Sequence, residues 1–156
     1  MYSEDAYDAF SERMEKTYPE MFAEPYGGFA VGAGWWPIIE SLCRQIDAYT
    51  KWRNNTRQAL LKDNPHNHSI PDEVHQVVVR QIKEKFGGLR FYYDGGDDMI
   101  DGMVRMAESW AGHSCEECGK PGKSRSGGWI RTLCDEHEAE RQAAQEKYAK
   151  ENGFEL

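Results

Sequence analysis

Three cysteines and one histidine near the C-terminus have the spacing of metal ligands. Cys115 and Cys118 form a C-x2-C pair, and Cys134 and His137 form a C-x2-H pair after fifteen intervening residues. Thiolate sulfur and imidazole nitrogen are the usual ligands of structural zinc, and two such pairs complete a tetrahedral set. The pattern predicts one structural zinc ion bound by these four side chains. Buried thiols without a metal would require this spacing to arise by coincidence.

The segments around the ligands predict a small zinc module over residues 113–156. Gly119 follows the first pair and allows a sharp turn beneath the metal. Residues 123–133 read as a hairpin that turns at Gly127 and Gly128, and a helix from about Asp135 to 150 carries the second pair. This order resembles the treble-clef class of zinc finger from residue 115 to about 150.

The complete ligand set argues against a catalytic metal. A catalytic zinc keeps one coordination position open for water and needs an acid or base nearby. Some nucleases on a treble-clef scaffold carry a catalytic histidine between the ligand pairs, whereas residues 119–133 contain no His, Asp or Glu. We therefore expect a non-enzymatic protein. His113 lies close enough to Cys115 to compete with His137 as a ligand, although a ligand at the helix start favours His137.

The segment between the ligand pairs is a basic island in an acidic chain. The chain has 19 Lys and Arg against 27 Asp and Glu, a net charge of -8. Within residues 119–133, a nucleic acid could be contacted by Lys123, Arg125, Trp129 and Arg131, through phosphate contacts and base stacking. The alternative is a solvated loop whose tryptophan packs against the helix. Bulk attraction to nucleic acid is disfavoured by the net charge.

A second candidate surface lies in residues 81–96. Alternation in the expected strands puts Lys83 and Lys85 on one face and Ile82 on the other, and the segment continues into Arg90 and Tyr92. A hairpin that served only as a scaffold would need fewer exposed functional groups. The segment therefore suggests either a partner-binding face or ordinary sheet packing.

The remainder of the chain predicts an α+β domain over residues 1–112. Apolar residues at helical spacing predict helices at about 3–17, 36–61 and 97–111, with Ser3 and Asp97 or Asp98 as N-caps. Residues 75–94 predict a β-hairpin with strands near 75–84 and 89–94, turning at Gly87 and Gly88. Residues 24–34 are rich in turn-forming residues and predict an irregular connection.

Three features predict a soluble protein of the cytosol. No apolar run approaches the length that spans a membrane, roughly 18 residues. The N-terminal residues also lack the pattern of an export signal. Three of the four cysteines have metal-ligand spacing, and Cys43 lies alone in an apolar helical pattern, where a buried thiol is expected. Reduced cysteines are typical of a reducing compartment.

Several blocks together resemble a family of small uncharacterised proteins encoded by bacteriophages and prophages. They are KEKFGGLRFYY, CxxCGKPG followed by GWIRTLCDEH, and the earlier GWWPIIESLC, so the likeness spans roughly residues 17–137. The resemblance implies an accessory phage product that binds a host protein, and inhibition of a bacterial defence system would be one such role. It implies no catalytic residues.

Overall fold

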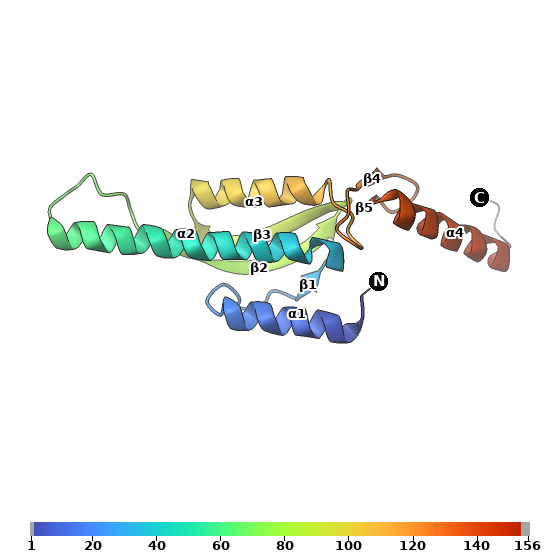
Figure 1. Cartoon of the computed structure of the whole chain (residues 1–156), viewed down its shortest axis with the longest axis horizontal. Helices are drawn as coiled ribbons and strands as arrows, with labels where there is room; N and C mark the ends of the chain where they lie inside the picture. Colours follow the sequence, from blue (N-terminus) through green and yellow to red (C-terminus); the bar gives the residue numbers. More distant parts are fainter. Residues whose placement is uncertain (1, 154–156) are drawn as a thin grey trace.

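The computed structural model describes residues 2–153 and has an α+β fold, as the sequence predicts (Figure 1). Its helices are α1 (Glu4–Thr17), α2 (Trp36–Asp63), α3 (Asp98–Ala111) and α4 (Asp135–Asn152), with one 3-10 turn, η1 (Ala33–Trp35). Its strands are β1 (Phe29–Ala30), β2 (His75–Lys85), β3 (Gly88–Gly96), β4 (Lys123–Arg125) and β5 (Arg131–Leu133). Among residues 2–153, no helix combines the length and apolar character needed to cross a membrane.

The main core lies between helices α2 and α3 and the β2–β3 hairpin. Figure 1 shows α2 and α3 running antiparallel along the strands, while the second half of α2 extends past the ends of the other helices. The apolar spacing of α2 buries Ile39, Leu42 and Ile46, and that of α3 buries Ile100 and Val104. The hydrophobic effect of burying these stripes against the sheet holds the helices in place.

An irregularity in β2 keeps its apolar residues on one face. Strict alternation would continue from Val77 and Val79 to residue 81, but the buried residue that follows is Ile82. The register with β3 shifts between Val79 and Gln81, as a β-bulge does by adding one residue to one strand. The bulge therefore turns the following segment so that Ile82 points inward and Lys83 outward.

The hairpin turns one residue earlier than the sequence suggests. Lys85 pairs with Gly88, so the two turn residues are Phe86 and Gly87, and the prediction of a Gly87–Gly88 turn is wrong. Phe86 and Gly87 both have positive φ angles, as a type I′ turn requires. A side chain in this left-handed region costs about 1–2 kcal/mol. The fold thus holds a phenylalanine in a conformation that asparagine or glycine usually adopts.

Helix α1 packs on β1 and on the start of α2 through aromatic contacts. The ring of Phe10 stacks on Trp36 at 4.7 Å and meets Phe29 edge-on at 4.8 Å. Phe29 belongs to β1, which pairs in parallel with β2, and its backbone N–H donates to the hydroxyl of Tyr7. The connection over residues 24–34 is therefore more ordered than its turn-rich sequence suggests.

Two predicted N-caps are confirmed. The hydroxyl of Ser3 accepts a hydrogen bond from the N–H of Ala6 at 3.2 Å. The carboxylate of Asp97 accepts from the N–H groups of Met99 and Ile100. Each cap satisfies helix N–H groups that have no partner within the helix.

Candidate metal centre

The four predicted ligand atoms come together in one cluster. The ligand atoms of Cys115, Cys118, Cys134 and His137 all lie within 4.8 Å of one another. His137 Nδ1 is 3.5 Å from the sulfur of Cys115 and 3.2 Å from that of Cys134, and the sulfurs of Cys118 and Cys134 are 3.8 Å apart. Metal–sulfur bonds of about 2.3 Å and metal–nitrogen bonds of about 2.0 Å give tetrahedron edges of about 3.8 and about 3.5 Å. The cluster therefore fits a tetrahedrally coordinated ion.

Histidine 137, rather than the competing His113, completes the set. Cys134 is the N-cap of α4, and His137 lies three residues later, in the first turn of the same helix. The Nδ1 atom of His113 instead lies 2.9 Å from the backbone oxygen of Ser109, and this side chain is exposed. Within residues 2–153, the cluster is the one group of three or more His, Cys, Asp or Glu side chains arranged to hold a metal ion.

The first ligand pair sits in a tight backbone turn. Gly119 has a positive φ, its N–H donates to the oxygen of Cys115 at 2.8 Å, and the N–H of Cys115 donates to the oxygen of Lys120 at 2.7 Å. Burial raises the pKa of the Cys115 thiol, but backbone N–H groups directed at the sulfur more than offset this and lower it. Burial and the neighbouring cysteines raise the pKa of Cys118 to about 11. A bound divalent cation would favour the deprotonated form of all three cysteines, because it stabilises each thiolate.

Residues 114–120, which we name the metal turn, pack directly on the segment that precedes α2. The N–H of Gly34 donates to the oxygen of Glu116 at 2.7 Å, and the indole N–H of Trp35 donates to the oxygen of Ser114 at 2.8 Å. Trp35 is fully buried. A Cβ atom on Gly34 would lie only 2.7 Å from the N atom of Cys118. The parts formed by residues 2–112 and 113–153 therefore meet in close backbone contact at the candidate metal site.

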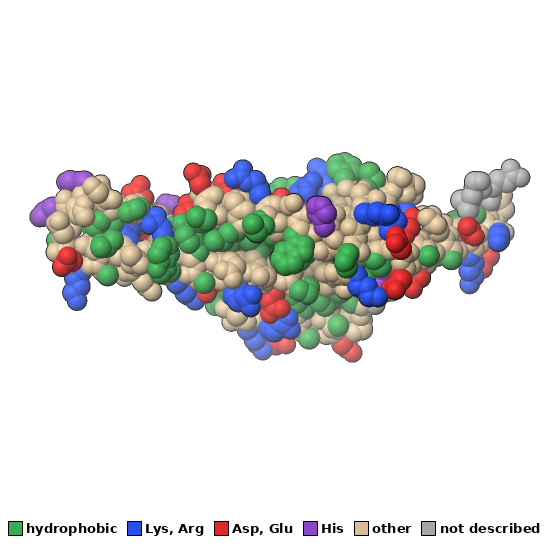
Figure 2. All heavy atoms as spheres, turned by 45° about the horizontal axis from the view of Figure 1, so that its top comes forward, with side chains coloured by type: hydrophobic (Ala, Val, Ile, Leu, Met, Phe, Trp, Pro, Cys, Tyr) green, Lys and Arg blue, Asp and Glu red, His purple; other side chains and the backbone are tan. Residues whose placement is uncertain are grey.

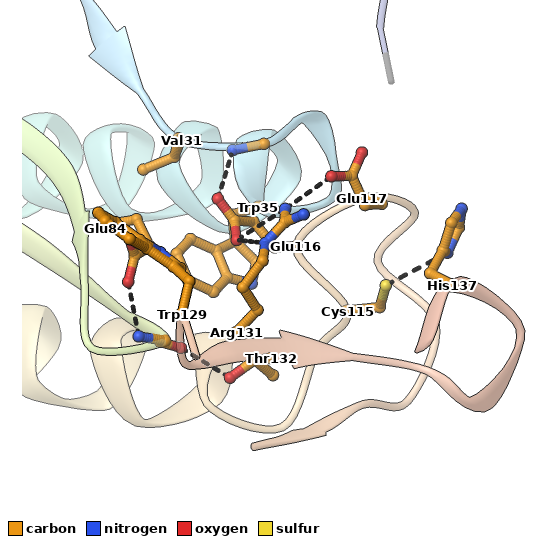
Figure 3. A network of polar contacts seen from close by, with 12 residues as sticks. Val31, Trp35, Glu84, Cys115, Glu116, Glu117, Trp129, Arg131, Thr132 and His137 are labelled. Atoms are coloured by element: carbon orange, nitrogen blue, oxygen red, sulfur yellow. Dashed lines mark hydrogen bonds and ion pairs between the residues drawn. The ribbon is translucent and has the colours of Figure 1, made fainter. Parts of the chain in front are cut away.

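A buried carboxylate joins the two parts (Figure 3). Glu116 is 6% exposed, and its carboxylate accepts from the N–H of Gly32 at 3.1 Å and from the guanidinium of Arg131. The same guanidinium pairs with Glu117. Burial raises the pKa of Glu116, and Arg131 reduces that rise without cancelling it. Arg131 therefore neutralises a carboxylate that the fold requires.

Replacing Arg131 by methionine is expected to destabilise the metal-loaded protein by about 2–3 kcal/mol, because Glu116 would remain buried without its countercharge. Adding Glu116→Gln should recover more than half of this loss, since the amide oxygen can still accept from Gly32. Urea unfolding of the two single variants and the double variant measures the coupling. Wild-type stability in Arg131→Met would contradict the assigned role.

Two hairpin tips lie side by side next to this network. The carboxylate of Glu84 accepts from the N–H of Gly87 at 2.6 Å and from the indole N–H of Trp129 at 3.1 Å (Figure 3). The hydroxyl of Thr132 donates to the oxygen of Gly87 at 2.6 Å. Glu84 thus stabilises the strained turn and joins it to the loop between β4 and β5.

The two tips enclose an apolar cleft of about 330 Å³. Phe86 from the β2–β3 turn is 74% exposed, Trp129 from the other loop is 71% exposed, and Ile130 is 39% exposed. Trp129 does not pack as a core residue would. We name Phe86, Trp129 and Ile130 the tip cleft. The two surfaces that the sequence offers as alternatives are therefore neighbours.

The predicted contact residues fall into two groups. Arg125 and Arg131 are held by carboxylates, the first by Asp135, and Lys123 lies 4.0 Å from the same carboxylate. The basic island is therefore largely neutralised by acids that flank it in the sequence. Lys83, Lys85, Arg90 and Tyr92 form the outward face of the β2–β3 hairpin, and the three cations make no ion pair with any carboxylate of residues 2–153.

Several residues that build the site were not singled out from the sequence. They are Gly32, Gly34, Trp35, Glu84, Phe86 and Glu116. The alternating glycines of VGAGW and the two acids inside the CEEC turn were the available signals. Nothing local indicates that these two segments, far apart in the chain, form one interface.

Searches with the whole chain found no match among family models, curated proteins or solved structures.

Proposed function

We propose that this chain is a non-enzymatic protein-binding factor, with one structural zinc ion on Cys115, Cys118, Cys134 and His137. Three cysteine sulfurs and one histidine nitrogen at tetrahedral distances are the usual donor set of structural zinc. Such a set leaves no coordination position for a substrate or an activated water. The ion stabilises the turn, and the turn holds the β4–β5 loop against the β2–β3 hairpin.

The observation that carries the binding role is the tip cleft. A strained, mostly exposed phenylalanine costs folding free energy, and such outliers concentrate at functional sites. Aromatic side chains are enriched at protein interfaces and contribute much of their binding energy. The proposed partner presents an apolar side chain to the cleft and acidic groups to Lys83, Lys85 and Arg90. On the family resemblance, we place the protein in the cytoplasm of a bacterial host, as a phage accessory factor with a host protein as its target.

A nucleic acid bound through residues 119–133 is the weaker candidate. Phosphate binding by this hairpin requires free cations, whereas its Arg125 and Arg131 are paired with carboxylates. Trp129 is exposed enough to stack on a base, but its indole N–H is already bonded to an acid. A gel-shift titration with single-stranded and double-stranded oligonucleotides distinguishes the two candidates.

Replacing Phe86 by asparagine is expected to remove partner binding while stabilising the fold by about 1 kcal/mol. Asn-Gly is the preferred type I′ turn, so the substitution relieves backbone strain and deletes the exposed ring. The measurement combines urea unfolding with affinity capture from bacterial lysate by the zinc-loaded protein. A specific host protein should be captured by the wild type and reduced at least about tenfold with Phe86→Asn.

The matched control is Tyr148→Ala, which removes an exposed aromatic ring from α4. It should capture the same protein as the wild type. Equal capture by Phe86→Asn would contradict the role of the tip cleft, as would the absence of any specific protein at every salt concentration. Capture that disappears on nuclease treatment would favour the nucleic acid.

A further inference from the structure

The surface of α3 is divided into three stripes. One stripe is buried against the core and consists of Ile100, Val104, Ala107 and Ala111. A second carries every charge of the helix: Asp98, Asp101, Arg105 and Glu108. It faces β3, because Asp101 accepts from the hydroxyl of Tyr93 and Glu108 from the N–H of Phe91. The third stripe, Met99, Met103, Met106 and Trp110, is apolar, and of its four residues only Met103 is partly buried against the core.

Three residues of this third stripe are largely open to solvent. Met99 is 55% exposed, Met106 is 72% exposed and Trp110 is 60% exposed. Soluble helices normally place polar residues on such a face. A helix with a second apolar stripe usually buries it against another surface.

Helix α2 presents a matching uncharged stripe beside it. Ser41 and Gln45 line a groove of about 110 Å³ between the two helices. The same helical spacing continues to Ala48 and Trp52. Trp52 is 62% exposed. Among the charged residues of this part of α2, Glu40 pairs with Arg13 of α1 and Asp47 pairs with Lys51. Arg44 flanks the stripe, and its guanidinium donates to the hydroxyl of Ser41 at 3.5 Å.

We name the two stripes together the uncharged band. Its members are Ser41, Gln45, Ala48, Trp52, Met99, Met103, Met106 and Trp110. Figure 2 shows hydrophobic side chains gathered along this face, over α2 and α3. Charged residues make up 29% of the chain, yet none of these eight residues is charged, and Arg44 lies only at the edge of the band, against Ser41. Depletion of charge with enrichment of Trp and Met is the composition of an interface core.

We propose that the uncharged band is the interface of a two-fold symmetric homodimer, in which α2 and α3 of one copy pack against those of another. A partner for this face must also be apolar and free of charge, and the same band on a second copy meets both requirements. In a two-fold interface one patch must supply both projections and recesses.

The band supplies both. Its projections are the two tryptophans and the exposed methionines. Its recesses lie at the small residues Ser41 and Ala48 and at Gly102, which adjoins the band. Gly102 stands between Met99 and Met106 on α3, and a Cβ atom there would meet nothing within 4 Å. Glycine inside a helix costs about 1 kcal/mol relative to alanine. Open space at this position would admit a side chain of the second copy.

The size of the face indicates a dimer of moderate affinity. From Met99 to Trp110 the stripe extends about 17 Å, and two adjoining helices are about 20 Å wide. The projected footprint is therefore about 340 Å² on each copy, which is smaller than that of a stable protein interface and typical of a weak, transient one. We therefore expect dissociation constants of about 1–100 µM, since area sets only a range for affinity.

Sedimentation velocity of the zinc-loaded full chain, from about 1 to about 500 µM, tests the proposal. The wild type should pass from monomer to dimer over this range. Met106→Glu should weaken dimerisation at least about tenfold, because the two-fold axis brings two uncompensated charges into the interface. Its position is mostly exposed in the monomer, so folding and zinc content should not change. Tyr148→Glu makes the same type of change on α4 and should leave dimerisation intact.

The methionine methyl groups give a second readout. In protein labelled at these methyls, the NMR signals of Met99, Met103 and Met106 should shift with concentration, while those of the buried Met14 and Met21 should not. A wild type that stays monomeric at the highest concentration overturns the proposal and leaves the face to a different protein. A dimer that Met106→Glu does not weaken overturns it as well. Partner binding through the tip cleft is tested independently of dimerisation, because Phe86 and Trp129 lie outside the uncharged band.

Discussion

Chelation of the metal ion is expected to unfold residues 113–133 and to lower the melting temperature of the protein by about 20 °C or more. Structural zinc contributes roughly 10–16 kcal/mol in small zinc modules, as much as the total stability of a typical domain. The loss should spread into the main core because the backbone of Ser114 and Glu116 is bonded to Trp35 and Gly34. Circular dichroism melting curves with and without chelator measure it.

Cysteine alkylation shows where the metal-free chain opens. With metal bound, no thiol should react; after chelation, Cys115, Cys118 and Cys134 should react rapidly. Cys43 should stay protected until global unfolding, because it is fully buried and burial raises the pKa of its thiol. Cys134→Ser should reproduce the effect of chelation, whereas Cys43→Ala should still bind one equivalent of zinc. Less than about half an equivalent of zinc, with intact folding in chelator, would refute the structural role.

Replacing Gly34 by alanine is expected to cost about 3 kcal/mol or more and to weaken metal binding. The added Cβ atom would lie 2.5 Å from the N atom of Gly119 and 2.7 Å from that of Cys118, with the oxygen of Cys115 nearer still. These are backbone atoms of the metal turn, so no side-chain rotation can relieve the overlap. Either the turn separates from η1 or the ligands move apart.

The matched substitution is Gly102→Ala, at a helix position where a Cβ atom meets nothing. It should stabilise the monomer by about 0.5–1 kcal/mol. The measurement is made at about 1 µM protein, where we expect the chain to be monomeric. Urea unfolding and competition with a chromophoric zinc chelator give stability and metal affinity for both variants. Equal affinities for Gly34→Ala and the wild type would contradict close packing at the metal turn.

Local pattern was enough to predict most elements and the four side chains that come together in the candidate metal centre. Helical spacing predicted the bounds of α1, α2 and α3 to within about two residues. The C-x2-C and C-x2-H spacing from Cys115 to His137 was sufficient to predict which four side chains form the cluster. The turn at Phe86 was displaced because two adjacent glycines offer two registers, and strand pairing selects between them. Propensity alone favours the glycine pair over a phenylalanine with positive φ.

The neutralisation of the basic side chains in the β4–β5 hairpin could not be predicted from residues 119–133 alone. Residues 119–133 contain no acid, so the segment reads as strongly basic. Folding brings Glu116 and Glu117 onto Arg131, and Asp135 onto Arg125. The irregular connection predicted at 24–34 is present, apart from the two residues of β1 and the start of η1. The packing of its glycines on the metal turn could not be predicted, because a linear pattern does not record contacts between distant segments.

The packing of the metal turn on Gly32 and Gly34 also fixes an order of events during synthesis. Its hydrogen bonds join residues 79 and 84 positions apart, so the early part of the chain leaves the ribosome long before its partners exist. Until Ser114 emerges, the indole N–H of Trp35 has no acceptor, and until His137 follows, the ion has an incomplete ligand set. Long-range closure of this kind slows folding. Metal capture should therefore be the final step of maturation, and nascent chains shorter than about 140 residues should remain exposed to proteases and chaperones.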